Sequence, residues 1–282
     1  MNVKEILNGW YEADMERHRL NQIPEILHRM KQGELTREQL ISIIGVRYQA
    51  AHFFEEMLED MHFAIHQGRF RTMEGEFPWP ECKEALRAAV LTNLSEERGE
   101  IAEYGGPHSN ARKVFLEALG VDYEKWQPDP CGYNSPERLD ELVAYVLGQM
   151  QFAIHCGAIE AVAALWYYEN RISLDGVHGD YCILLKAFEG AFPEFKKPQG
   201  SYKEGDPLWH LASHAQHDEH HAKLAEDALS TLDGKPGMWE DSIDIGIRTA
   251  HLALLNFWNG LSERHCGAFD SRAHWKHERL VV

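Results

Sequence analysis

The segment LWHLASHAQHDEHHAKLAEDAL, residues 208–229, concentrates side chains that bind metal ions. In an α-helix, His214, Asp218 and His221 stand at positions i, i+4 and i+7, so all three project from one face. His210 and His217 fall near the same line. Buried imidazoles and carboxylates need partners that offset lost hydration, and a transition metal ion is the simplest partner. The alternative interpretation is an idle cluster of solvated surface histidines.

Composition narrows the classes of partner. The chain has 282 residues, with 28 Lys and Arg against 45 Asp and Glu and a formal net charge of -17. Nucleic acids and anionic membrane surfaces select basic proteins, so we expect neither as a partner. The N-terminal segment lacks the basic start and apolar core of a signal peptide, which predicts a cytoplasmic protein. Five scattered cysteines without a C-x-x-C pair indicate reduced thiols.

Helical periodicity dominates the chain, and no run of alternating β-branched residues indicates a strand. The sequence therefore predicts an all-α bundle of roughly seven to nine helices. We expect one domain over residues 1–282, with a polar C-terminal tail from about 265 to 282. The expected helices span residues 1–15, 23–31, 35–66, 81–103, 108–119, 136–171, 178–189, 208–229 and 238–264.

The helix expected at 136–171 supplies a further metal-binding side chain. Residues 142–168 contain no Lys, Arg or Asp, but Gln149, Gln151, His155 and Glu160 make a membrane span a poor interpretation. A helix buried in the protein fits better. Glu160 lies among small residues in HCGAIEAVAALW, where a carboxylate must be neutral, paired or metal-bound. The alternative to a metal ligand is a protonated Glu160 hydrogen-bonded to a backbone group or a tyrosine.

The segment NLSEERGEIAEYGGPH, residues 93–108, offers more donors. It contains Glu96, Glu97, Glu100 and Glu103, and periodicity alone does not choose between Glu96 and Glu97. His108 opens the following helix, where an ordinary N-terminal residue is the simpler interpretation when that position is considered alone.

Together these strings resemble the heme-oxygenase-like diiron oxidases and oxygenases. The shared pattern is N-L-x-E-E-x-G, a histidine about ten residues later, a buried A-I-E-A, and H-x-x-x-D-x-x-H with D-E-H-H-A at its end, within residues 41–229. That family includes a 1-undecene-forming fatty-acid decarboxylase, amino-acid N-oxygenases and fragmenting enzymes, and the self-sacrificing p-aminobenzoate synthase of chlamydiae. The resemblance implies a heme-oxygenase-like helical bundle, related in fold to the thiaminase-like proteins, with a central metal site. The iron ligands that it implies are Glu97, His108, Glu160, His214, Asp218 and His221.

One position departs from the family pattern. Some relatives carry an additional Glu on an early helix, whereas the nearest positions here hold Ala51 and His52, with Glu55 one turn further on. His52 and Glu55 therefore stay open as additional ligands. The substrate pocket is expected to include Tyr48, His52, Trp166 and Arg171. Arg47 and Arg248 are, with Arg171, the arginines considered as partners for a substrate carboxylate.

The resemblance implies chemistry that uses two iron ions and O2 as co-substrate. Imidazole nitrogen and carboxylate oxygen without cysteine suit iron or manganese better than structural zinc. The expected activity is N-oxygenation, oxidative C–C cleavage or desaturation of a small amino acid or related carboxylate or amine in specialised metabolism. Two alternatives stay open, a fatty-acid oxidative decarboxylase of the same family and a non-catalytic metal-binding protein. Whether two copies form a homodimer is also open.

Overall fold

The computed structural model describes residues 2–68, 79–101, 106–126, 139–198 and 200–267, without the side chains of residues 124, 125 and 216–218. Within these ranges the protein is helical and has no β-strand, so the predicted all-α class is confirmed. The helices are α1 Val3–Arg19, α2 Glu25–Gln32, α3 Arg37–His52, α4 Phe54–His66, α5 Pro80–Glu97, α6 His108–Ala118, α7 Tyr123–Trp126, α8 Glu141–Cys156, α9 Ala158–Ser173, α10 Asp180–Ala191, α11 Trp209–Ser230 and α12 Trp239–Cys266.

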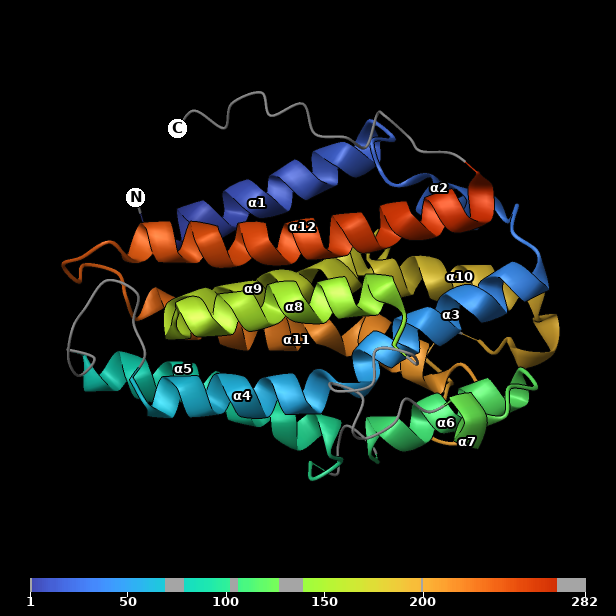
Figure 1. Cartoon of the computed structure of the whole chain (residues 1–282), viewed down its shortest axis with the longest axis horizontal. Helices are drawn as coiled ribbons and strands as arrows, with labels where there is room; N and C mark the ends of the chain where they lie inside the picture. The colour runs from blue at the N-terminus through green and yellow to red at the C-terminus, as the bar shows by residue number, and fades with distance from the viewer. Residues whose placement is uncertain (1, 69–78, 102–105, 127–138, 199, 268–282) are drawn as a thin grey trace.

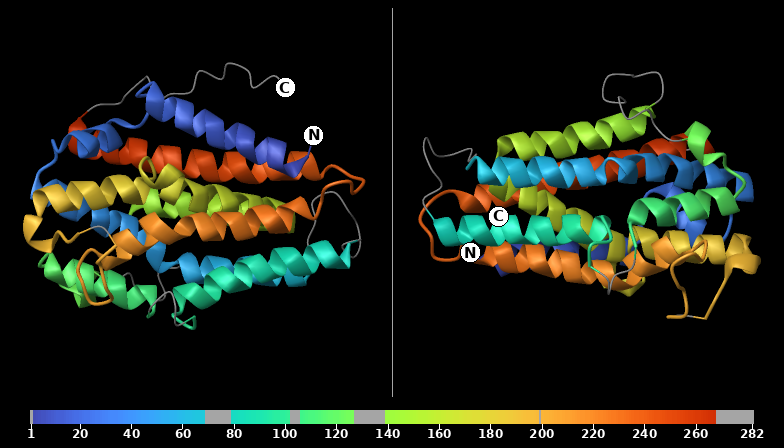
Figure 2. Two further views of the ribbon diagram at one scale, coloured as in Figure 1. Left: turned by 180° about the vertical axis from the view of Figure 1, so that it is seen from behind. Right: turned by 90° about the horizontal axis from the view of Figure 1, so that it is seen from below.

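Helix α9 occupies the centre of the bundle. Every residue of α9 except Asn170 is buried, and the helix contacts α8, α11 and α12 along much of its length. Figure 1 shows α1 and α12 on one side of this central layer and α4 and α5 on the other. Figure 2 shows the same order from behind, with α11 beside α9. Polar residues of α9 can therefore reach partners only on neighbouring helices.

The closest helix contact joins α9 to α12. A Cβ atom at Gly246 of α12 would lie 2.2 Å from the carbonyl oxygen of Glu160 and 2.9 Å from Cβ of Ala163. Glycine is therefore the residue that allows the two backbones to approach this closely. Further along the same pair, the Tyr167 hydroxyl meets Nδ1 of His251 at 2.6 Å, so the two helices run parallel.

Two long helices predicted from the sequence are interrupted, so those predictions are wrong. The segment expected at 136–171 divides at Gly157, whose φ of 158° and ψ of 177° belong to a region open essentially to glycine alone. Because α8 runs antiparallel to α12 and α9 runs parallel to it, the chain reverses at this residue. The segment expected at 35–66 divides at Phe53, where neither Gly nor Pro marks the break.

The helix expected at 81–103 also ends early. Helix α5 stops at Glu97, and Gly99 follows with a φ of 68°. The Gly99 N–H donates to the carbonyl of Glu96 at 2.9 Å, and the Glu100 N–H donates to that of Ser95. A left-handed glycine closing the last turn is a common helix end. This early end places Glu96 and Glu97 in the last turn of the helix.

Two other expectations concern membrane insertion and cysteine chemistry. None of the helices in the described ranges has the length and apolarity that crossing a lipid bilayer requires. The described cysteines, Cys82, Cys156, Cys182 and Cys266, are free thiols, as predicted. Cys131 and most of the predicted polar tail lie outside the described residues.

We predict that Gly246→Ala lowers the free energy of unfolding by about 1–3 kcal/mol, because the added methyl group must push α12 away from α9. The matched control is Gly148→Ala in α8, where a Cβ atom meets nothing within 4 Å. That change should stabilise the helix by about 0.5–1 kcal/mol. Urea unfolding of both variants measures the difference, and equal stability of the two would contradict the close approach.

Candidate metal centre

Helix α11 presents three buried histidines to the interior. His210, His214 and His221 are all buried, and they face α9, α5 and α6. His220 is exposed, as expected from its phase on the helix. The side chains of His217 and Asp218 lie outside the described part of the chain, so the predicted position of Asp218 among the ligands stays a prediction.

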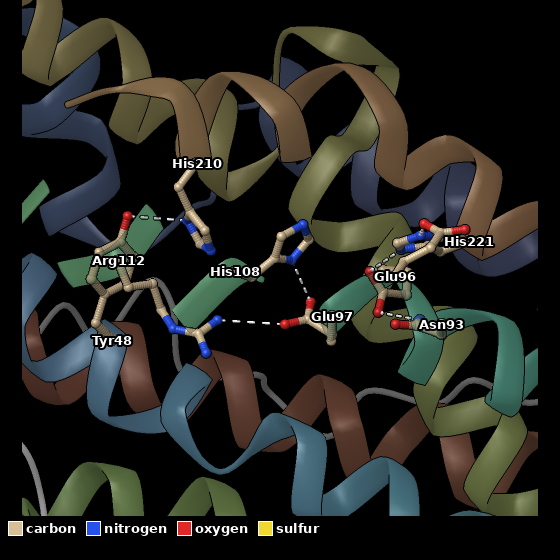
Figure 3. A network of polar contacts seen from close by, with 9 residues as sticks. Tyr48, Asn93, Glu96, Glu97, His108, Arg112, His210 and His221 are labelled. Carbon is tan, nitrogen blue, oxygen red and sulfur yellow. Dashed lines mark hydrogen bonds and ion pairs between the residues drawn. The ribbon is translucent and has the colours of Figure 1, made fainter. Parts of the chain in front are cut away.

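The first group of donors joins α11 to α6. His108, at the start of α6, offers a ring nitrogen to the same point as His210 and His214, and one donor atom from each lies within 4.8 Å of the others. His108 Nδ1 and Glu97 Oε1 are 2.9 Å apart, and Arg112 Nη1 lies 3.5 Å from Glu97 Oε2 (Figure 3). All of these side chains are buried. We call His108, His210, His214 and Glu97 the histidine group.

The second group lies about two turns further along α11, around His221. Its Nε2 contacts Oε2 of Glu96, and its Nδ1 lies 3.7 Å from Oε2 of Glu169. Asn93 Nδ2 donates to the other oxygen of Glu169 at 2.9 Å. Figure 3 shows Glu96 and Glu97 directed to different histidines from the end of α5. We call Glu96, Glu169 and His221 the carboxylate group.

The two groups share one electrostatic environment. Burial, followed by the charge of His108, lowers the pKa of His214 to about 3, while Glu97 and Glu169 oppose that shift. His214 therefore interacts with a carboxylate from each group. Burial raises the pKa of Glu97, but His108, Arg112 and His214 outweigh it and hold that pKa well below its ordinary range. His214 is thus held neutral and Glu97 ionised, which are the forms in which an imidazole and a carboxylate bind cations.

Two atoms of this interior that could bind a metal ion lack hydrogen-bond partners. Among the described residues, Oε1 of Glu96 and Nε2 of His210 are buried with no hydrogen-bond partner. Buried polar atoms are normally paired, so an unpaired donor set requires an explanation. Cations bound at the two groups would satisfy them, and nitrogen and oxygen donors without sulfur suit iron or manganese. The residues present therefore fit a transition metal centre.

The structure does not bring Glu160 to these donors. Glu169 reaches His221, and Glu160 precedes Glu169 by nine residues on α9. Nine residues correspond to two and a half helical turns, so Glu160 lies about 13.5 Å away along the axis and on the opposite face. Its backbone faces Gly246 of α12 instead. The acidic residue of α9 that joins the cluster is therefore Glu169, which the sequence analysis missed. His210, which that analysis placed near the ligand face, was not among the predicted ligands.

Of the expected pocket residues, Tyr48 borders the site. The Tyr48 hydroxyl shares a hydrogen bond of 3.1 Å with Nδ1 of His210. His52 is partly buried, and burial together with Arg112 lowers its pKa. Trp166 packs beside Tyr167, with ring centroids 6.4 Å apart. Glu55 forms an ion pair with Arg98.

Arg171 belongs to a different polar network on the α1 side of α9. Its Nη2 lies 3.2 Å from Oδ1 of Asp180, and its Nη1 lies 2.6 Å from Nε2 of His18. The other oxygen of Asp180 accepts a hydrogen bond from the indole of Trp258. Arg171 therefore already has a buried carboxylate partner, which weakens its expected role in the substrate pocket.

The described residues thus define an all-α protein with a buried cluster of metal-binding side chains. Models of known protein families do not match this chain, and comparison with curated proteins finds no similar sequence. The functional proposal therefore depends on the geometry of the cluster and on the motifs in the sequence.

We predict that Glu169→Gln and His214→Ala lower the iron content of protein loaded anaerobically with Fe2+, from about two ions per chain in the wild type. Each substitution removes a donor that converges on the site. Glu160→Gln is the matched control, because it makes the same change on the same helix but on the opposite face. Metal analysis after desalting tests this, and loss of iron from Glu160→Gln but not from Glu169→Gln would refute the assignment.

We also predict that the metal-free protein loses stability as the pH falls below about 6.5. Burial, then Arg171 and Lys31, lowers the pKa of His18 to about 2, and burial, then Arg17, lowers that of His251 to about 3. Below pH 6.5 the unfolded chain takes up protons that the folded protein does not. Each histidine then contributes a slope of about 1.4 kcal/mol per pH unit.

His251→Gln should reduce this slope between about pH 6 and pH 4, whereas the exposed His155→Gln should leave it unchanged. Denaturant unfolding at a series of pH values provides the measurement. An unaltered slope in His251→Gln would show that this imidazole is not held neutral by the fold.

Proposed function

We propose that this protein is an O2-dependent non-heme diiron oxidase or oxygenase. The observation that carries the proposal is the convergence of three carboxylates and four imidazoles from α5, α6, α9 and α11 in the buried interior. Their separation into two adjacent groups supports two metal ions rather than one. Both groups combine nitrogen and oxygen donors, as carboxylate-rich iron sites in helical bundles do.

The residues around the cluster would fix the imidazoles in the tautomers that bind metal. When the Nδ1–H of a neutral His108 donates to Glu97, Nε2 is the unprotonated nitrogen that would bind metal. His210 is held in the same way if its Nδ1–H donates to the oxygen of Tyr48. Asn93 orients the carboxylate of Glu169. Two ferrous ions bound there would together supply electrons for the reduction of O2.

We also propose that the bundle is of the heme-oxygenase-like type. Support comes from the order of the donors along the chain, which matches the family pattern of an acidic residue and a histidine, then an acidic helix, then a histidine helix. The contribution of Glu169 in place of Glu160 keeps this order. The buried central position of α9 agrees with the role of the acidic helix.

The substrate class that we propose is a small amino acid or related carboxylate or amine. The reaction would be N-oxygenation, oxidative C–C cleavage or desaturation. Burial of the whole donor cluster favours catalysis, because water must be excluded where a reactive centre forms. A metal storage role would need the same donors without a substrate-binding region beside them.

The test is exposure of anaerobically loaded Fe2+ protein to O2 in a stopped-flow spectrometer and an oxygen electrode. We expect a transient visible absorbance and O2 consumption above that of free iron in buffer. His214→Ala loaded with the same iron is the control, and it should show neither effect. Binding of about two irons without a transient or O2 uptake, with amino acids and fatty acids present, would favour the non-catalytic metal-binding role instead.

A further inference from the structure

Two buried arginines border the histidine group. Arg47 lies on α3 and Arg112 on α6, and their side chains are only 2 % and 4 % exposed. The positive charge of each arginine opposes the rise that burial causes in the pKa of Tyr48 and contributes to the lowered pKa of His210. We call Arg47 and Arg112 the arginine pair. A guanidinium group stays charged in proteins, so this side of the cluster holds two buried positive charges.

The arginine pair has too few carboxylate partners. Arg112 lies 3.5 Å from Glu97, at the outer limit of a hydrogen bond, and Glu97 is shared with His108. In the described ranges no carboxylate lies within ion-pair distance of Arg47, which hydrogen-bonds to Tyr168 and interacts at longer range with Asp180, the partner of Arg171. Two other arginines of the chain do have carboxylate partners. Arg171 pairs with Asp180 in the interior, and the partly exposed Arg248 pairs with Asp244 on its own helix.

Aromatic rings hold Arg47 next to the donors. Its guanidinium carbon lies 5.3 Å from the ring centre of Tyr168 and 5.0 Å from that of Tyr181. The Tyr181 ring in turn stands 5.8 Å from the His210 ring and 5.2 Å from the His214 ring. Arg47 is thus separated from the histidine group by a single aromatic ring. Aromatic faces partly stabilise the buried cation but do not neutralise it.

Burial and charge together indicate what the pair would bind. Three buried guanidinium groups, those of Arg47, Arg112 and Arg171, share the two buried carboxylates of Glu97 and Asp180, which leaves one more positive charge than these partners neutralise. A buried charge without a partner is unfavourable, and a singly charged carboxylate both neutralises it and matches the planar fork of a guanidinium. A doubly charged phosphate would instead leave an excess negative charge beside the acidic cluster.

We propose that Arg47 and Arg112 bind the carboxylate of the substrate beside the metal centre. The binding of a carboxylate follows from the described residues alone, and only its assignment to the substrate rests on the proposed function. The pair would select acids over neutral molecules of the same shape. Arg47 and Arg112 would then determine specificity and position the remainder of the acid toward the donor cluster.

The experiment compares two acids with their uncharged amides, in metal-free and in iron-loaded anaerobic protein. Isothermal titration calorimetry measures binding of hexanoate against hexanamide and of L-norleucine against L-norleucinamide. The wild type should bind at least one acid about tenfold or more tightly than its amide. Arg47→Met and Arg112→Met should each remove most of that preference, whereas Arg248→Gln should retain it. The acid that is preferred distinguishes a fatty acid from an amino acid.

Equal binding of acids and amides by the wild type, or no binding of either acid, would overturn the proposal without any variant. Retention of the acid preference in both arginine variants would overturn it as well. Thermal unfolding without ligand adds a check, because Arg47→Met should be about as stable as the wild type if Arg47 has no structural carboxylate partner. Iron content measured on the same samples separates this test from the diiron proposal, since metal-free protein can bind the acid when iron binding fails.

Discussion

The burial of α9, in which every residue but Asn170 is buried, is the constraint on which both polar clusters depend. A helix with no face toward water must satisfy each polar side chain with groups from its neighbours, because an unpaired buried charge is strongly unfavourable. Glu169 meets His221 and Asn93 on one side, and Arg171 meets Asp180 and His18 on the other. Helices α5 and α11 thus supply partners for one network, and α1 and α10 supply partners for the second. The donor cluster is the first of these networks, so its position follows from the position of α9.

The sequence predicted the histidine helix well, because its signal is local. Three donors on one face of one helix require only the helical period, and His214 and His221 are buried as that period implies. Glu97 and His108 were chosen as ligands from a motif rather than from geometry, and the structure brings the two side chains together. The choice of acidic residue on α9 was not predictable in the same way. Glu160 and Glu169 are both buried, and the small residues near Glu160 serve the approach of α12.

The helix breaks show why the sequence did not reveal which face of α9 meets the donor cluster. Gly157 has ordinary neighbours in the sequence, and its reversal of the chain depends on backbone angles that only glycine adopts readily. The break at Phe53 involves no glycine or proline, so local propensity gives no sign of it. At Gly157 the chain returns alongside α12, a helix distant in sequence, whereas α3 and α4 continue in the same general direction past Phe53 (Figure 1). Periodicity contains no information about either break. The all-α class was predictable, whereas the register between helices was not.

The one-residue reversal at Gly157 also limits how this protein can change length. Helix α8 leads into α9 without a loop that could absorb an added residue. An insertion between Gly157 and Glu169 would rotate everything beyond it by about 100° and advance it by about 1.5 Å. The same insertion would therefore separate Glu169 from His221 and Arg171 from Asp180. Divergent descendants of this chain should therefore vary in the length of the segment between α10 and α11, while the number of residues from Gly157 to Arg171 stays fixed.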